Sequence, residues 1–195
     1  MTPLTAPSRY VRLKHLTRAV ALISTVALFG PDGAQAQMHG HGADGTGHNM
    51  RTMPGLRGLN ATPEESAELA LMFRGFQTIT REVENLPNGI RTVTGSTNEA
   101  VMAALTSHVV GMIARVEAGD DPQIMIQSPT LDLFFARGPS IVTDIEVTDA
   151  GIVVVQTTDD PELVEALHIH AAEVTAMADR GMHAVHEMMM NRAAN

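Results

Sequence analysis

Two histidines of this chain stand at matching positions in two apolar helical stripes. Each lies at the spacing i, i+4, i+7 and i+11 that places side chains on one face of a helix. The spacing therefore predicts that both imidazoles point towards the interior. The stripes comprise Val101, Leu105, His108 and Met112 in one segment and Leu163, Leu167, His170 and Val174 in the other, with Met177 one turn further on.

A pair of interior imidazoles suits two kinds of metal chemistry. Copper is bound by imidazole and thioether side chains, so His108 and His170 would form an internal copper site with Met112 and Met177 nearby. Haem iron takes two axial histidines, and because the chain has no Cys, the same pair would hold a haem noncovalently. The alternative interpretation is two core histidines that bond to backbone carbonyls and are retained through common ancestry.

A second group of candidate ligands lies near the amino terminus, in residues 37–60, which are rich in Gly, His and Met. Cleavage after Ala36 would put His39 at position three of the new chain. The α-amine, two backbone amides and that imidazole then form a four-nitrogen square plane for Cu(II) or Ni(II). The alternative is a flexible leader with incidental histidines. The other candidates here are His41, His48, Met38, Met50 and Met53.

The carboxyl-terminal segment after Gly181 is also rich in Met and His. If it is helical, Met182, His186 and Met189 or Met190 share a face, and His183 lies three residues before His186. His168 would lie on the same side if the preceding helix continues unbroken through Gly181. The alternative is an amphipathic tail that packs its Met side chains, which are flexible core fillers, on the body of the protein.

The elements that must position these histidines are duplicated. Segment 71–119 aligns with segment 133–181 at a constant offset of 62 residues without a gap. Repeats of this kind indicate one supersecondary unit used twice. The identical pairs include Leu71 and Leu133, Phe73 and Phe135, Ile79 and Ile141, Glu84 and Glu146, Gly89 and Gly151, Leu105 and Leu167, His108 and His170, and Gly119 and Gly181.

Each copy is predicted to be helix, hairpin, long helix. Thr62-Pro63 opens the first short helix, and Asn88-Gly89 between β-branched segments is typical of a hairpin turn. A capping box from Ser96 to Glu99 would start one long helix, and Asp160-Pro161 the other. The sequence thus predicts an α+β fold of two tandem αββα repeats, 61–127 and 128–195. They would form a four-stranded antiparallel sheet packed against helices on one face, with a pseudo-twofold axis.

Residues 1–36 are predicted to be a signal peptide. Four basic residues precede the apolar stretch 19–30, and Ala34-Gln35-Ala36 supplies a small-x-small cleavage site. The apolar stretch is shorter than the ~20 residues that span a bilayer. We therefore expect a periplasmic mature chain that does not insert into the membrane.

The mature chain would carry 9 basic and 21 acidic residues, a formal net charge of −12. This acidity argues against nucleic acid as a partner, because such binding needs clustered Lys and Arg. No zincin motif, nucleophile elbow, P-loop or dinucleotide fingerprint occurs, so the sequence favours a binding protein over an enzyme. Asp120-Asp121 and Asp159-Asp160 are predicted to be solvated acids at helix ends.

The residues from Pro87 to Thr94, followed by a capped helix with Leu105-x-x-His108, resemble a group of small exported bacterial proteins. The second copy, from Gly151 to Pro161 with Leu167-x-x-His170, is similar. The resemblance covers most of residues 71–186. It implies the tandem αββα architecture and the paired histidines, and no activity. The His/Met-rich ends resemble periplasmic copper-binding proteins in composition.

The sequence taken as a whole predicts a periplasmic copper-binding protein that serves copper trafficking, storage or tolerance. The alternatives are a noncovalent haem-binding or electron-transfer module that uses His108 and His170, and a metal-free protein-interaction module. The expected partners are a metal ion and a periplasmic metalloprotein or redox protein.

Overall fold

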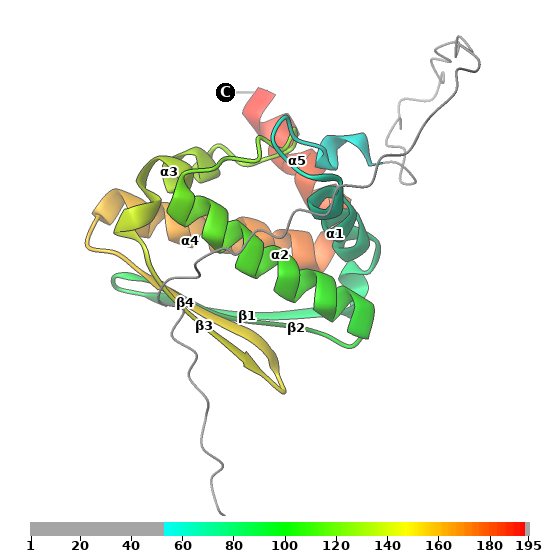
Figure 1. The fold of residues 1–195 in the computed structure, drawn as a ribbon, viewed down its shortest axis with the longest axis horizontal. Helices are drawn as coiled ribbons and strands as arrows, with labels where there is room; N and C mark the ends of the chain where they lie inside the picture. Colours follow the sequence, from blue (N-terminus) through cyan, green and yellow to red (C-terminus); the bar gives the residue numbers. More distant parts are fainter. Residues whose placement is uncertain (1–52, 194–195) are drawn as a thin grey trace, which may run out of the picture.

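The computed structural model describes residues 53–193. The predicted signal peptide and the amino-terminal candidates Met38, His39, His41, His48 and Met50 lie outside these residues. The strands are β1 (Ile79–Leu86), β2 (Gly89–Ser96), β3 (Val142–Thr148) and β4 (Gly151–Thr157). They form one antiparallel sheet in the order β1-β2-β4-β3, and the helices pack on one side of it (Figure 1). The predicted α+β class with a four-stranded antiparallel sheet is confirmed.

The strand registers follow the offset of 62 residues. In the central pair, Thr92 lies opposite Val154, its own counterpart in the other copy. Ile90 pairs with Gln156 and Thr94 with Ile152, so the register is symmetric about the Thr92–Val154 pair. A twofold axis through this pair would produce the same register. The two hairpins also match, since β1–β2 closes at Leu86–Gly89 and β3–β4 at Thr148–Gly151.

The long helices α2 (Glu99–Ala118) and α4 (Pro161–Arg180) have 20 residues each and begin 62 positions apart. The short helices are α1 (Pro63–Arg74) and α3 (Thr130–Arg137), and the 3₁₀ turns are η1 (Pro54–Leu56), η2 (Phe76–Thr78) and η3 (Gly138–Ser140). Thr62 and Glu65 form a capping box at α1, and Asp160 caps α4.

The expected capping box from Ser96 is wrong. Asn98 is the N-cap of α2, because its side-chain oxygen accepts from the amides of Ala100 and Val101. Ser96 ends β2, and its hydroxyl accepts from the amide of Asn98 instead.

Side chains of each long helix pack against a strand of the other copy, and α2 also lies against β2 of its own copy. Leu163 and Leu167 of α4 are fully buried in one cluster with Ile90 of β2, and Leu105 of α2 packs with Ile152 and Val154 of β4. Within residues 53–193, α2 is the one helix long and apolar enough to cross a membrane, and here it lies over the sheet. The core is therefore shared between the copies, so neither copy buries its apolar face alone.

The chain does not continue straight from α4 into its last helix. Gly181 interrupts the helix with φ 57° and ψ −137°, and α5 (Met182–Ala193) starts in a new direction. A Cβ at Gly181 would lie 2.9 Å from the ring of Phe76, so close packing as well as backbone conformation requires glycine there. Val185 of α5 is buried against α1 and the 53–56 segment.

Candidate metal centre between the two long helices

Three buried polar atoms stand out on α2 and α4, two of them on the matching histidines. Nδ1 of His108, Nδ1 of His170 and Oε2 of Glu173 are all buried and have no hydrogen-bond partner. Only one other buried side-chain nitrogen or oxygen in residues 53–193 shares this condition, Nε of Arg81 on β1. Buried polar atoms are nearly always paired, so these three exceptions need an explanation, such as a bound ion.

His108 lies on α2 in a site that disfavours its charged form. Burial lowers the pKa of His108 to about 4, while the carboxylate of Glu65 raises it and the nearby His170 lowers it. The imidazole of His170, on the other long helix, thus lies within electrostatic range of His108. At neutral pH the His108 ring is uncharged and carries an unshared nitrogen lone pair, which is the form that binds metals.

His170 lies one helix away, on α4, between an aromatic ring and a carboxylate. The ring of Phe134 meets it edge to face, with centroids 5.5 Å apart and planes at 88°. Oε2 of Glu173 lies 3.7 Å from Nδ1 of His170, beyond hydrogen-bonding distance. The hydroxyl of Ser128 donates to Oε1 of Glu173 at 2.7 Å, whereas Oε2 has no hydrogen-bond partner and only its contact with His170.

The carboxylate of Glu173 is ionised at neutral pH. Burial raises the pKa of Glu173, but His170, Ser128 and Arg192 lower it, and the net pKa is below the ordinary value. The sequence reasoning missed both Glu173 and Ser128. A carboxylate three residues after a histidine on one helix face was the available signal for Glu173.

The two thioethers expected near the histidines have different surroundings. Met177 lies two turns beyond His170 and packs in the apolar cluster of Leu56, Phe73 and Val185. Met112 lies one turn beyond His108 on α2 and is half-buried. Met177 therefore contributes to the core between α1 and α5, while Met112 remains beside the imidazole of its own helix.

His168 faces a different part of the molecule. Its Nε2 lies 2.9 Å from the carbonyl oxygen of Gly89 and 3.2 Å from that of Leu86. Since both partners are acceptors, Nε2 must carry the proton and donate to them. His168 therefore fastens α4 to the β1–β2 turn, and its Nε2 has no free lone pair for a metal.

The carboxyl-terminal candidates lie on α5. Because Gly181 breaks the helix, His168 and His186 are not on one continuous helical face, as the unbroken helix would have required. Met182 and Met188 pack into the core cluster, whereas His186, Met189 and Met190 are exposed. His183 contacts Glu187 at 3.2 Å, and Arg180 pairs with the same carboxylate. The predicted packing of Met side chains on the body applies to two of these residues.

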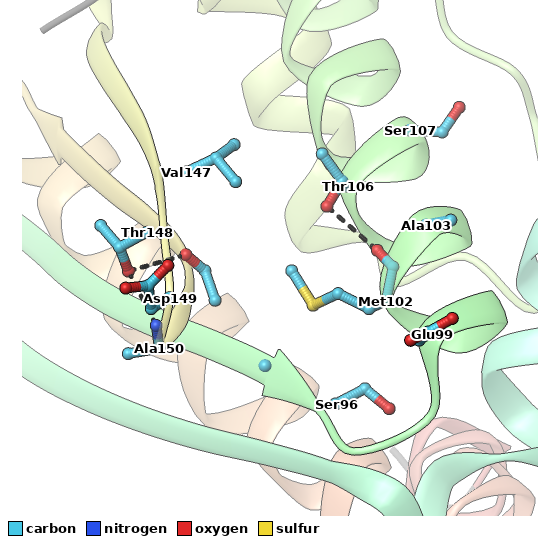
Figure 2. A pocket seen from close by; sticks show the side chains of 12 residues that line it. Ser96, Glu99, Met102, Ala103, Thr106, Ser107, Val147, Thr148, Asp149 and Ala150 are labelled. Atoms are coloured by element: carbon cyan, nitrogen blue, oxygen red, sulfur yellow. Dashed lines mark hydrogen bonds between the residues drawn. The ribbon is translucent and has the colours of Figure 1, made fainter. Parts of the chain in front are cut away.

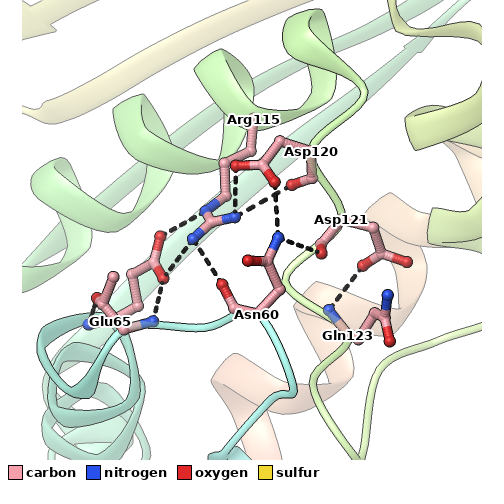
Figure 3. A network of polar contacts seen from close by, with 7 residues as sticks. Asn60, Glu65, Arg115, Asp120, Asp121 and Gln123 are labelled. Carbon is pink, nitrogen blue, oxygen red and sulfur yellow. Dashed lines mark hydrogen bonds and ion pairs between the residues drawn. The ribbon is translucent and has the colours of Figure 1, made fainter.

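A polar network borders the site on the side of Glu65 (Figure 3). The guanidinium of Arg115 donates to both oxygens of Glu65, at 2.6 and 2.9 Å, and to Asp120 at 2.8 Å. Asn60 donates to Asp120 and to the carbonyl of Asp121. Asp120 and Asp121, which had been predicted to be solvated acids, thus join the end of α2 to the segment before α1.

Two grooves flank the sheet, one between α2 and the β3–β4 turn and the other between α4 and β1. The groove beside α2 has a volume of about 660 Å³, and Met102 and Thr106 face the β3–β4 turn across it (Figure 2). The groove beside α4, of about 500 Å³, contains His168 at the position that matches Thr106. Neither groove is lined by His108 or His170.

The described residues contain no ready-made cluster of three or more His, Asp or Glu side chains arranged around one point. The candidate site is therefore a pair of imidazoles with one carboxylate beside it. Comparison of the chain with protein-family models, curated proteins and solved structures finds no match.

Proposed function

We propose that this protein is an exported copper-binding protein of the periplasm, and that His108 and His170 bind the metal between α2 and α4. One observation carries the proposal: the buried Nδ1 atoms of both histidines, at matching positions of two duplicated helices, lack any hydrogen-bond partner. A core histidine with a structural role would bond to a carbonyl, as His168 does. A bound metal ion would satisfy both nitrogens at once.

The composition favours copper over other metals. The chain has 9 His and 13 Met but no Cys, so imidazole and thioether are its soft ligands. Iron–sulfur clusters need thiolates, which this chain cannot supply. Zinc also binds imidazole and carboxylate, so the preference for copper over zinc rests on the Met side chains, whose thioethers are copper ligands. The His and Met side chains of the two termini would recruit copper, and the imidazole pair would hold it inside the fold.

Elemental analysis tests the proposal directly. The mature chain would be purified from periplasm without chelators, in a background with His39, His41, His48, His183 and His186 replaced by Ala (the tail-silenced chain). We expect the tail-silenced chain to retain about one equivalent of copper. His108→Ala together with His170→Ala in the same background should remove it, while Glu165→Gln on the exposed face of α4 should not.

Other outcomes would support the other functions. A Soret band with one equivalent of iron, lost in the His108→Ala/His170→Ala variant, would support the haem-binding alternative. A tail-silenced chain with neither metal nor haem, which also takes up no added copper, would refute the proposal and favour the interaction module.

A further inference from the structure

Glu173 is placed beside the imidazole pair by the fold. It follows His170 by one turn of α4, and its two oxygens have different surroundings. Oε1 accepts a hydrogen bond from Ser128, which is buried, whereas Oε2 is buried without a hydrogen bond and faces Nδ1 of His170. A carboxylate that is oriented through one oxygen and left open at the other is typical of a metal ligand with an outer-shell partner.

The distance between Glu173 and His170 fits a shared ion. At 3.7 Å, Oε2 of Glu173 and Nδ1 of His170 are too far apart for a hydrogen bond. Two ligands with metal bonds of about 2.0–2.2 Å stand about 3.7 Å apart when their angle at the metal is roughly 120°. Both atoms lack other partners. For His108 to bind the same ion, its side chain must turn towards the space between Oε2 of Glu173 and Nδ1 of His170, because the three groups do not surround one centre in the described residues.

Charge gives the carboxylate a further role. Two neutral imidazoles leave the full charge of a bound cation uncompensated in the interior, and a buried, unpaired charge is costly. One carboxylate removes one unit of that charge. The benefit is larger for Cu(II), which also favours nitrogen and oxygen ligands, than for Cu(I), which favours softer ones.

We infer that Glu173 is the third ligand of the internal site and makes it a Cu(II) site, with Ser128 as the residue that positions the carboxylate. This inference rests on the proposed function. Copy 1 has Gly111 at the matching position, so the carboxylate comes from one copy only, although each copy supplies a histidine.

The test compares Cu(II) and Cu(I) affinities in the tail-silenced chain, each measured by competition with a chromophoric chelator. Glu173→Gln keeps the shape of the side chain and the ability to accept from Ser128. It should weaken Cu(II) binding at least tenfold and Cu(I) binding less than threefold, and shift the Cu(II) electron paramagnetic resonance spectrum. Ser128→Ala should weaken Cu(II) binding by a smaller factor without removing the ligand. Glu165→Gln is the matched control.

Two results would overturn the inference, and they are distinguishable. Unchanged Cu(II) affinity and spectrum in Glu173→Gln, with binding lost in His108→Ala/His170→Ala, would exclude Glu173 as a ligand and leave the proposed function standing. Unchanged copper binding in His108→Ala/His170→Ala would refute both. Thermal unfolding of each variant without metal verifies that the changes act on the site and not on the fold.

Discussion

The two αββα segments of the chain have matching elements but different polar side chains. The long helices α2 and α4 are equal in length, and the two hairpins pair in the same register. Many positions on these helices nevertheless differ in chemistry while His108 and His170 agree. Three differing pairs lie near the histidines in the sequence: Thr106 and His168, Gly111 and Glu173, and Arg115 and Met177.

This difference distinguishes the residues that stabilise the fold from the two histidines that we propose to bind the metal. His168, Arg115 and Met177 make contacts that fasten each helix to its own surroundings. Thr106 instead donates to the carbonyl of Met102 within its own helix. The histidines share neither those contacts nor any hydrogen bond at Nδ1. Divergence at structural positions beside identity at the unpaired histidines is the pattern expected if the pair acts jointly. Exchanging residues between the copies tests this comparison.

The largest effect is expected from Arg115→Met, which gives copy 1 the residue of copy 2. The side chains of Arg115 and Glu65 are 14% and 18% exposed, so the change leaves a largely buried carboxylate without its partner. We expect a loss of about 3 kcal/mol in the free energy of unfolding, measured by urea denaturation at pH 7.

The control for this change is Arg137→Met. Arg137 joins α3 to the start of α4 through more exposed ion pairs with Asp160 and Glu162, so its loss should be much smaller. In a double-mutant cycle, Glu65→Gln together with Arg115→Met should cost less than the sum of the single changes. Equal losses in Arg115→Met and Arg137→Met would contradict the importance assigned to the Glu65 network.

Acid should destabilise the copper-free protein through His108. Burial lowers the pKa of His108 from 6.5 to about 4, so the unfolded state binds the proton more readily between these values. The stability that the neutral form provides is fully present above about pH 6.5 and is lost as the pH falls towards 4, by at most about 3 kcal/mol. His108→Gln should flatten the dependence of the urea midpoint on pH between 6.5 and 4.5, with a chelator present. The exposed His183→Gln should leave it unchanged, and an unchanged slope in His108→Gln would refute this account.

The sequence predicted the architecture well because its signals are local. The Asn88-Gly89 turn, the Asp160 cap and the offset of 62 residues each depend on neighbouring residues or on simple alignment. The lack of a hydrogen-bond partner at Nδ1 of His108 and of His170 depends instead on where the surrounding elements place their donors and acceptors. Glu173 could not be recognised without knowing that Ser128, 45 positions away, takes one of its oxygens. The break at Gly181 likewise depends on contact with Phe76 across the fold.

His168→Thr gives copy 2 the residue of copy 1 and should have a moderate effect. It removes the donor to the carbonyls of Leu86 and Gly89, at a cost of about 1–2 kcal/mol. Amide hydrogen exchange should become faster around the β1–β2 turn and remain unchanged around the β3–β4 turn. Copper binding should persist, because Nε2 of His168 is a donor to backbone. Loss of copper from the tail-silenced His168→Thr variant would instead place this histidine in the metal site.

The smallest effect concerns Gly111, the counterpart of Glu173. A glycine inside a helix costs about 0.5–1 kcal/mol relative to alanine, and a Cβ at position 111 would meet no atom within 4 Å. Gly111→Ala should therefore stabilise the protein by that amount. Gly119→Ala, at a position with φ 65° at the end of the same helix, should destabilise it. Unchanged copper affinity in the Gly111→Ala variant would mean that the metal site does not use the open space beside Gly111. The carboxylate of Glu173 would then be the one contribution made at this pair of matching positions. Weaker copper binding would mean that the metal uses the space beside His108, so that the glycine belongs to the site as much as Glu173 does.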